Sequence, residues 1–368
     1  MARGAIPAIG LKGASVSHLH SVFFFYALGK RGIFDMPSIQ QQFRSMFSPE
    51  KPKIGIAFGS GGARGWAHIG VIRALKERGI QPACLAGSSI GAIAAALWAE
   101  DRLAAFEELA GGMNPKTAAA LFLEFKLNRG GLFSGERAMQ TLRKLLPVES
   151  FSELPIPFAA VATDLNDGRP VVLNTGYILD ALRASFAIPG IFVPAVTPKG
   201  QVLIDGAYSN PLPMDVVRAM GAEYVIAVNI DSTIACPYQT DVVSKVEQTL
   251  IHAQNRISAF LRENGWFSSL HRKTDDDGKW RGGKPGRREK PESKPASLGM
   301  MDVILRAMRL AENRLILEQL ALSPPDLLIE PPVGDIATMD FSRSGDAIRA
   351  GYEAAMRVLA HAKIPGER

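Results

Sequence analysis

The stretch CLAGSSIGAIAAALWA, residues 84–99, contains a short apolar run and an alanine-rich run, which are joined by the polar segment Gly-Ser-Ser-Ile-Gly at residues 87–91. The first run is typical of a short buried strand, and the second has the composition of a helix. Packing alone does not require two serines and two glycines at such a junction. This polar segment therefore predicts a tight turn between a strand and a helix in an α/β fold, with Ser89 at the centre of the turn.

Strand-like and helix-like segments alternate along most of the chain on both sides of this polar segment. Runs rich in apolar and β-branched residues predict strands within residues 53–59, 83–87, 158–176, 201–210, 223–230 and 325–331. Runs with apolar residues at helical spacing predict helices within residues 63–79, 90–100, 178–190, 213–221 and 301–322, and in the tail from 344. This alternation predicts a three-layer α/β/α fold with helices on both faces of a mostly parallel sheet.

Composition divides the chain into four parts. Residues 1–50 carry no strong strand signal and are predicted to form an N-terminal extension, and residues 51–263 are predicted to form the α/β core. Residues 264–298 are rich in Gly, Lys, Arg, Asp and Pro, which predicts a flexible basic insertion with too little apolar surface to order itself. Residues 299–368 return to helical and strand patterns and are predicted to complete the core domain.

The composition is that of a globular protein with a sizeable core, since 47% of the 368 residues are hydrophobic. The net charge is +6, from 42 Lys and Arg against 36 Asp and Glu. Nine of the basic residues and five of the acidic ones fall within residues 271–294, so the rest of the chain is nearly balanced. This distribution argues against a nucleic-acid-binding surface spread over the protein.

Cysteine usage and the N-terminal segment indicate the compartment. The two cysteines, Cys84 and Cys236, are too few for a disulfide framework and fit a reducing environment. No group of Cys and His residues has the spacing of metal ligands. The apolar run SVFFFYAL, residues 21–28, is too short to span a bilayer. We therefore expect a cytoplasmic protein without a metal.

Residues 87–91 fit the pattern G-x-S-x-G, in which a serine nucleophile stands on a sharp turn between a strand and a helix. Glycines on both sides remove Cβ atoms that would collide with the turn and with the following helix. The N-terminus of that helix favours negative charge near Ser89. The alternative is a plain turn between strand and helix, and the flanking strand and helix favour the nucleophile.

A second glycine-rich turn, FGSGGARGWAHIG at residues 58–70, suits an anion, because successive glycines leave backbone amides unshielded. The anion is either a phosphate or an oxyanion. A dinucleotide fingerprint requires glycine where Arg64 stands, and no P-loop lysine follows, so nucleotide binding is disfavoured. We predict an oxyanion hole made by the amides of Gly61 and Gly62, and include Ala63 and Arg64 in the site. A structural salt bridge beneath the loop is the alternative role of Arg64.

A serine nucleophile needs a base, and none of the six histidines lies at a strand end or beside a tight turn. Asp205 does, in VLIDGAYSNPLP, where a short strand runs into a glycine turn. A carboxylate in a partly desolvated pocket can accept the proton of a serine hydroxyl directly. The alternative role of Asp205 is to cap the turn.

Four motifs, in this order along the chain, together resemble the patatin-like phospholipase family. Their sequences are most similar to those of bacterial members close to the neuropathy-target-esterase type. The motifs are GSGGARGWAHIGV, AGSSIGA, RASFAIPGIFVP and LIDGAYSNPLP. The resemblance is strong over residues 53–229 and returns over residues 324–355. It implies a patatin-like α/β/α fold and a Ser89–Asp205 dyad with the glycine loop as oxyanion hole. Two departures are Ser60, which interrupts the glycine run, and Gly-Ala after Asp205 in place of the common Gly-Gly.

The resemblance implies a serine hydrolase for carboxylic esters of lipids, of the phospholipase A or lysophospholipase type. Ser89 would form an acyl-enzyme that water then hydrolyses. The alternatives are an acyltransferase using the same dyad and a regulatory module without catalysis. We expect a lipid ester as substrate and no metal or organic cofactor. The basic segment within residues 271–294 suggests peripheral contact with an anionic membrane, and an inert solvated loop is its alternative.

Overall fold

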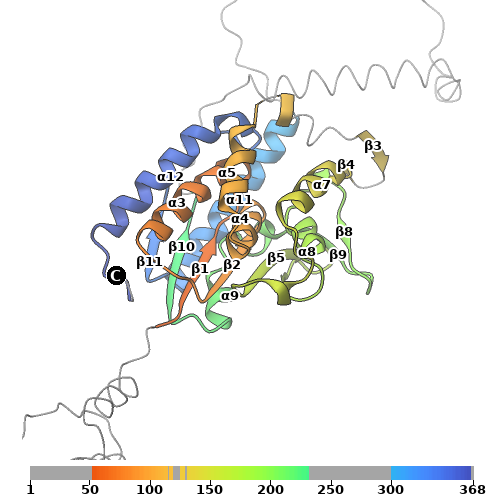
Figure 1. Cartoon of the computed structure of the whole chain (residues 1–368). Helices are drawn as coiled ribbons and strands as arrows, with labels where there is room; N and C mark the ends of the chain where they lie inside the picture. The colour runs from red at the N-terminus through yellow and green to blue at the C-terminus, as the bar shows by residue number, and fades with distance from the viewer. Residues whose placement is uncertain (1–51, 115, 119–124, 129–130, 232–299, 366–368) are drawn as a thin grey trace, which may run out of the picture. The chain divides into compact units, whose positions relative to one another are not determined.

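The computed structural model describes residues 52–114, 116–118, 125–128, 131–231 and 300–365 (Figure 1). The predicted N-terminal extension at residues 1–50 and the predicted insertion at residues 264–298 lie outside these described residues. The described segments belong to one compact unit, Pro52–Arg368.

An eight-stranded sheet forms the middle layer of the described chain. Along its main path the strands lie side by side in the order β11 (Leu327–Ile329), β10 (Tyr224–Val228), β1 (Ile54–Phe58), β2 (Cys84–Ser88), β5 (Phe158–Asp164), β9 (Val202–Asp205) and β8 (Ala195–Val196). The five strands from β11 to β5 are parallel to their neighbours, and β9, β8 and the additional strand β6 (Pro170–Leu173) pair antiparallel. The predicted mostly parallel sheet is confirmed.

Helices cover both faces of this sheet, which gives the predicted three layers. The helices on or around one face are α3 (Trp66–Glu77), α4 (Ile90–Ala99), α5 (Leu103–Gly111), α7 (Glu136–Leu145), α8 (Ile178–Ser185) and α12 (Ser344–Leu359), with α12 beside α3 (Figure 1). The other face is covered by α9 (Met214–Ala219) and by α11 (Met300–Leu322) through its buried Ile316.

Alternation of side chains along the central strands explains this arrangement. On β1, Ile56 and Phe58 pack into the cluster with α3 and α4, whereas Ala57 packs into the cluster with α9. Every residue of β1, β2 and β5 is buried, as expected for parallel strands covered on both faces. β11 extends the same sheet beside β10, so residues from the C-terminal part of the chain share this core.

The remaining elements are a small sheet and short 3₁₀ turns, which the sequence patterns did not predict. They are β3 (Phe125–Asn128), β4 (Gly131–Phe133), β7 (Gly190–Phe192), η1 (Gly62–Gly65), η2 (Phe151–Glu153), η3 (Gly206–Tyr208) and η4 (Phe341–Arg343). The helix predicted within residues 63–79 therefore begins with the tight turn η1 before α3. Gly61 and Gly62 have φ values of 151° and 58°, which explains why no regular helix begins there.

Strand β5 aligns the ends of two strands that are far apart in the sequence. Val161 of β5 is in register with Ser88 at the end of β2, and Ala162 is in register with Asp205 at the end of β9. β5 lies between these two strands, and β2 runs parallel and β9 antiparallel to it. The C-terminal ends of β2 and β9 therefore reach neighbouring positions on the two sides of β5. The close approach also explains Gly206, where a Cβ would lie 2.2 Å from the carbonyl oxygen of Val161.

Candidate active site

Ser89 lies at the turn between β2 and α4, in a backbone conformation that few residues other than glycine adopt. Its φ of 55° and ψ of −124° mark a strained turn, as expected for a nucleophile held clear of a sheet. Gly87 and Gly91 permit this turn, because a Cβ on either would lie 2.3 Å from backbone atoms of the facing segment. Steric crowding therefore explains why both positions of the G-x-S-x-G pattern are glycine.

The backbone amide of Ser89 is fixed by Ser185, a fully buried residue at the end of α8. The Ser89 amide donates to Ser185 Oγ at 3.0 Å, and that hydroxyl donates to the carbonyl oxygen of Val161 at 2.6 Å. Ser185 thus connects the turn of the candidate nucleophile to β5. The patterns did not single out Ser185, and its only signal is its place within the motif RASFAIPGIFVP.

Asp205 faces Ser89 from the end of β9. The Ser89 hydroxyl donates to Asp205 Oδ2 at 2.6 Å, and the amide of Ala207 donates to Asp205 Oδ1 at 2.9 Å. Asp205 is 2% exposed, and burial raises its pKa to about 7 against these two hydrogen bonds, which lower it. The structure therefore brings together the two residues predicted to act as nucleophile and base, and it also shows the turn-capping contact of Asp205.

A carboxylate with a pKa near neutrality is suited to accept a proton, because its basicity matches the working pH. Among the described residues, neither His68 nor His361 contacts Ser89. His68 is buried beneath the glycine loop, where its Nε2 lies 2.8 Å from the carbonyl oxygen of Gly59 and burial lowers its pKa to about 4. The described site thus offers Asp205 as the base.

The glycine loop lies against the same site. Gly61 and Gly62 line a cavity with Ser89 and Asp205. A Cβ on Gly62 would lie 2.4 Å from the carbonyl oxygen of Thr338, so the loop leaves no room for a side chain there. The arrangement gives two adjacent peptide units without side chains at the wall of the cavity, which suits the binding of an oxyanion.

Ala63 and Arg64 do not line that cavity, in contrast to their predicted place in the oxyanion site. The amide of Ala63 donates to the carbonyl oxygen of Thr338 at 2.8 Å, so this donor is already engaged. The side chain of Arg64 is fully buried and lies 3.2 Å from Asp231 Oδ1. Arg64 thus has the alternative role, a salt bridge beneath the loop.

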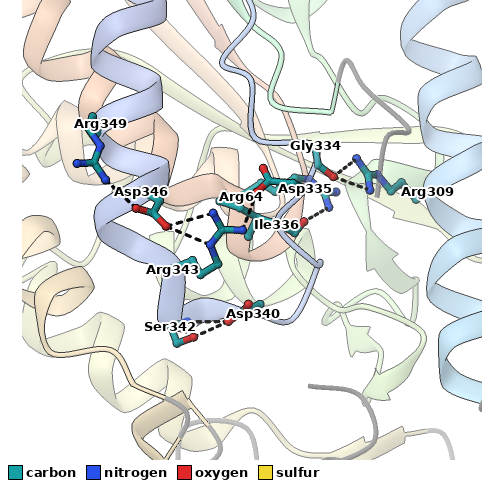
Figure 2. Close-up of polar contacts among 10 residues, drawn as sticks. All are labelled: Arg64, Arg309, Gly334, Asp335, Ile336, Asp340, Ser342, Arg343, Asp346 and Arg349. Carbon is teal, nitrogen blue, oxygen red and sulfur yellow. Dashed lines mark hydrogen bonds and ion pairs between the residues drawn. The ribbon is translucent and has the colours of Figure 1, made fainter. Parts of the chain in front are cut away.

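Asp231 joins three segments around the glycine loop. Its Oδ1 lies 2.6 Å from Arg309 Nε of α11 as well as near Arg64. Figure 2 shows both guanidinium groups reaching one loop, with Arg64 donating to the carbonyl oxygen of Ile336 at 3.2 Å and Arg309 donating to that of Gly334 at 3.5 Å. The patterns missed Asp231 and Arg309, because no motif marks them and they are 78 residues apart.

Two cavities meet at Ser89. The polar cavity takes its name from the polar groups at its wall, which belong to Ser60, Gly61, Gly62, Ser89, Asp205, Tyr208, Arg309, Glu312 and Thr338. Most of its wall is nevertheless apolar, with Ile188, Leu305, Met308 and Leu315 in the lining. The lining of the apolar cavity includes Trp66, Ile93, Phe106, Leu109, Leu142, Phe186, Phe192 and Phe341. Both are lined by Gly62, Ser89 and Ile188, so Ser89 lies between two largely apolar spaces, of which only the polar cavity is also lined by charged side chains.

Within the part of the chain that the structure describes, no group of three or more His, Cys, Asp or Glu residues is placed to hold a metal ion. Among the same residues, no helix has the length and apolar character needed to cross a membrane.

Comparison with known proteins places this geometry in a family. The model of the patatin-like phospholipase family matches residues 56–218. An NTE family protein of Mycobacterium tuberculosis is 32% identical over 331 residues, which cover 84% of this chain and 91% of the relative. Patatin-like phospholipase domain-containing protein 7 of Mus musculus is 35% identical over 185 residues, which cover 49% of this chain and 14% of that protein.

Among solved structures, VipD from Legionella pneumophila aligns with a TM-score of 0.40 and 15% identity, covering 84% of this chain and 67% of VipD. The family match lies over the segment that carries Ser89 and Asp205, and the mycobacterial match extends over nearly the whole relative. The chain therefore belongs to the patatin-like phospholipase family, and it shares most of its length with NTE family proteins.

Proposed function

We propose that the protein is a serine acyl hydrolase that cleaves the carboxylic ester bond of a lipid, with Ser89 as nucleophile and Asp205 as base. The observation that carries this proposal is the 2.6 Å hydrogen bond from Ser89 Oγ to Asp205 Oδ2 at the junction of the polar and apolar cavities. Membership of the patatin-like phospholipase family supports the same assignment.

In the first half of the reaction, Asp205 takes the proton of the Ser89 hydroxyl while Oγ bonds to the ester carbonyl carbon. The carbonyl oxygen becomes an oxyanion, for which the amides of Gly61 and Gly62 are the candidate donors. One such donor typically lowers the barrier by about 3 to 4 kcal/mol. The tetrahedral intermediate then expels the alcohol, whose oxygen receives the proton from Asp205, and the acyl group stays on Ser89.

In the second half, Asp205 takes a proton from a water molecule whose oxygen attacks the acyl carbonyl carbon. The Ser89 Oγ–carbon bond breaks, the proton returns to Oγ, and a free carboxylic acid leaves. An elevated pKa suits both roles of Asp205, since the same group must accept a proton and give it back.

The two cavities suggest how the substrate lies. The apolar cavity, with Phe106, Phe186 and Phe192 in its lining, suits an acyl chain, because each methylene group transferred from water gains about 0.8 kcal/mol. The polar cavity has a largely apolar wall that also carries Arg309 and Glu312, which suits the glycerol or lysolipid side of the ester. Gly62 and Ser89 line both cavities, so the scissile carbonyl would sit between them.

The test is release of fatty acid from phospholipid and lysophospholipid micelles by the purified full-length protein. We expect Ser89→Ala and Asp205→Asn each to lower the rate by at least about 1,000-fold, as for partners that act as a unit. Ser88→Ala is the matched control, because Ser88 is buried next to Ser89 but has no hydrogen-bond partner for its hydroxyl among the described residues. Equal activity of wild type and Ser89→Ala would refute the proposal.

An acyltransferase on the same dyad is the alternative, and the fate of the acyl group distinguishes the two. Hydrolysis in H₂¹⁸O introduces one ¹⁸O atom into the released fatty acid, whereas transfer to an added alcohol yields a new ester without free acid. We expect labelled free acid to be the main product, and predominance of a new ester would favour the acyltransferase.

A further inference from the structure

Helix α11 brings a second carboxylate, Glu312, into the polar cavity. Glu312 is half-buried and lines this cavity with Gly61, Ser89 and Asp205. The hydroxyl of Ser60, which is 1% exposed, donates to Glu312 Oε1. Glu312 therefore contacts the residue that directly precedes the two glycines of the candidate oxyanion hole.

The polar face of α11 fixes the position of Glu312. Arg309 Nε donates to Asp231 Oδ1 at 2.6 Å, and Asn313 Nδ2 donates to the backbone carbonyl oxygen of Asp231 at 2.6 Å. Ile316 packs against the sheet one turn further on. Arg309, Glu312, Asn313 and Ile316 have the spacing of a single helix face, so these contacts aim the Glu312 carboxyl at the loop.

The other partners of the glycine loop also come from outside it. The amide of Ser60 donates to the carbonyl oxygen of Pro211 at 2.9 Å, and the amide of Ala63 donates to that of Thr338 at 2.8 Å. Gly61 and Gly62, between these two bonds, have positive φ values, and because glycine has many accessible conformations, contacts on both sides are needed to select this one. Glu312 supplies the side-chain bond on the N-terminal side of the two glycines.

We propose that Glu312 is a positioning residue that accepts the hydrogen bond of Ser60 and thereby aligns the amides of Gly61 and Gly62 with the oxyanion. This inference rests on the proposed function and adds a residue to the same site. Glu312 acts through Ser60 and makes no bond to the reacting atoms. Its effect is expected on kcat, because the amides are needed more in the transition state than in the bound substrate.

Burial and the charges around Glu312 favour the neutral form of its carboxyl group. The pKa of Glu312 is raised to about 8, because burial and the nearby charges of Asp231 and Asp205, which raise it, outweigh the Ser60 hydrogen bond and Arg64, which lower it. Among the residues that the structure describes, the remaining titratable and charged groups in the lining of this cavity are Tyr208 and Arg309.

An ionised Glu312 would repel the negative charge that develops on the ester carbonyl oxygen. Asp205, with its pKa of about 7, must be ionised to accept a proton, and Glu312, with its pKa of about 8, must not be. We therefore expect kcat/KM to rise with pH near 7 and to fall near 8.

The experiment measures kcat and kcat/KM between pH 5.5 and 10 on a soluble short-chain ester, for the full-length wild type and variants. Glu312→Gln keeps an acceptor for Ser60 but cannot ionise, so we expect its kcat/KM to lack the alkaline fall. Glu312→Ala loses the acceptor, and we expect kcat to drop about 10- to 100-fold, as for a displaced transition-state contact. Glu312→Gln should recover most of that loss.

Two further variants sharpen the test. Glu318→Gln is the matched control, because Glu318 lies exposed on the same helix and pairs with Arg314 at 2.9 Å. Its pH profile should coincide with that of the wild type. Ser60→Ala removes the hydrogen bond from the other end, so it should lower kcat as Glu312→Ala does and move the alkaline fall to higher pH. The double variant of Ser60 and Glu312 should show no further loss.

The results separate this inference from the proposed function. An active wild type whose alkaline fall persists in Glu312→Gln, or whose kcat is unchanged in Glu312→Ala, overturns the role of Glu312 alone. A wild type with no ester hydrolysis at any pH overturns the proposed function and this inference with it. Because Glu312→Gln is nearly isosteric, its profile decides the question even where Glu312→Ala fails to fold.

Discussion

Replacing Asp205 by asparagine should stabilise the protein while it abolishes activity, and the gain should depend on pH. Burial raises the pKa of Asp205 from 3.8 to about 7. A carboxyl whose pKa is higher in the folded than in the unfolded state destabilises the fold as pH rises between the two values. Asparagine carries no such penalty, and its amide can take the Ala207 amide on Oδ1 and face Ser89 Oγ with Nδ2.

The magnitude follows from the two pKa values. Since each pH unit corresponds to about 1.4 kcal/mol, ionisation of Asp205 lowers the free energy of unfolding by about 1.5 kcal/mol at pH 5 and about 4 kcal/mol at pH 8. The advantage of Asp205→Asn over the wild type should therefore grow by about 2 to 3 kcal/mol between these pH values. For a domain of this size that is about 5 °C in melting temperature.

The assay is thermal unfolding of wild type and Asp205→Asn at pH 5, 6, 7 and 8. Asp167→Asn is the control for loss of a carboxylate, because Asp167 is an exposed turn residue with a 51% exposed side chain. Its melting temperature should follow that of the wild type at every pH. A constant difference between Asp205→Asn and wild type across this range would show that Asp205 does not have the raised pKa on which its role as base depends.

Three other substitutions test the packing and the cavity. Gly91→Ala places a Cβ 2.3 Å from a backbone carbonyl oxygen and should lower the melting temperature by at least about 10 °C, whereas Gly345→Ala, with open space around its Cβ position, should leave it within about 2 °C. Arg64→Met leaves Asp231 buried without one of its two arginines, so the free energy of unfolding should fall by about 3 kcal/mol in denaturant titrations, and an unchanged midpoint would contradict the buried pair. Ile93→Phe puts a larger side chain into the lining of the apolar cavity and reduces its free space, so kcat/KM should fall at least about tenfold more for long-chain esters than for short-chain ones. An equal effect on both would place the acyl chain elsewhere.

The sequence predicted the parts of the site that lie within single motifs. The turn at Ser89 could be predicted because strand, glycines and helix follow one another within residues 84–99, and local sterics determine that geometry. Asp205 could be proposed from its strand end, from the lack of a placed histidine and from the family resemblance. Their 2.6 Å contact could not be predicted, because it depends on the register of β5 with both β2 and β9.

Contacts between residues that are far apart in the sequence could not be predicted from the sequence motifs. The loop motif placed four consecutive residues, from Gly61 to Arg64, in the predicted oxyanion site, but the Ala63 amide donates to Thr338, which lies 275 residues later in the sequence. The sequence predicted a helix within residues 301–322, but no motif marks its polar side chains. Only the packing of α11 on the sheet shows that Arg309 and Glu312 face the site and that the exposed Glu318 does not.

The most direct test of the central claim is covalent labelling of the full-length protein with a fluorophosphonate, followed by mass-spectrometric mapping of the modified peptide. The account predicts a single adduct on Ser89, formed by the wild type and Ser88→Ala at similar rates and formed far more slowly by Asp205→Asn. An adduct on Ser88 or on another serine, or labelling of Ser89 at the same rate with and without Asp205, would contradict a nucleophile that Asp205 activates.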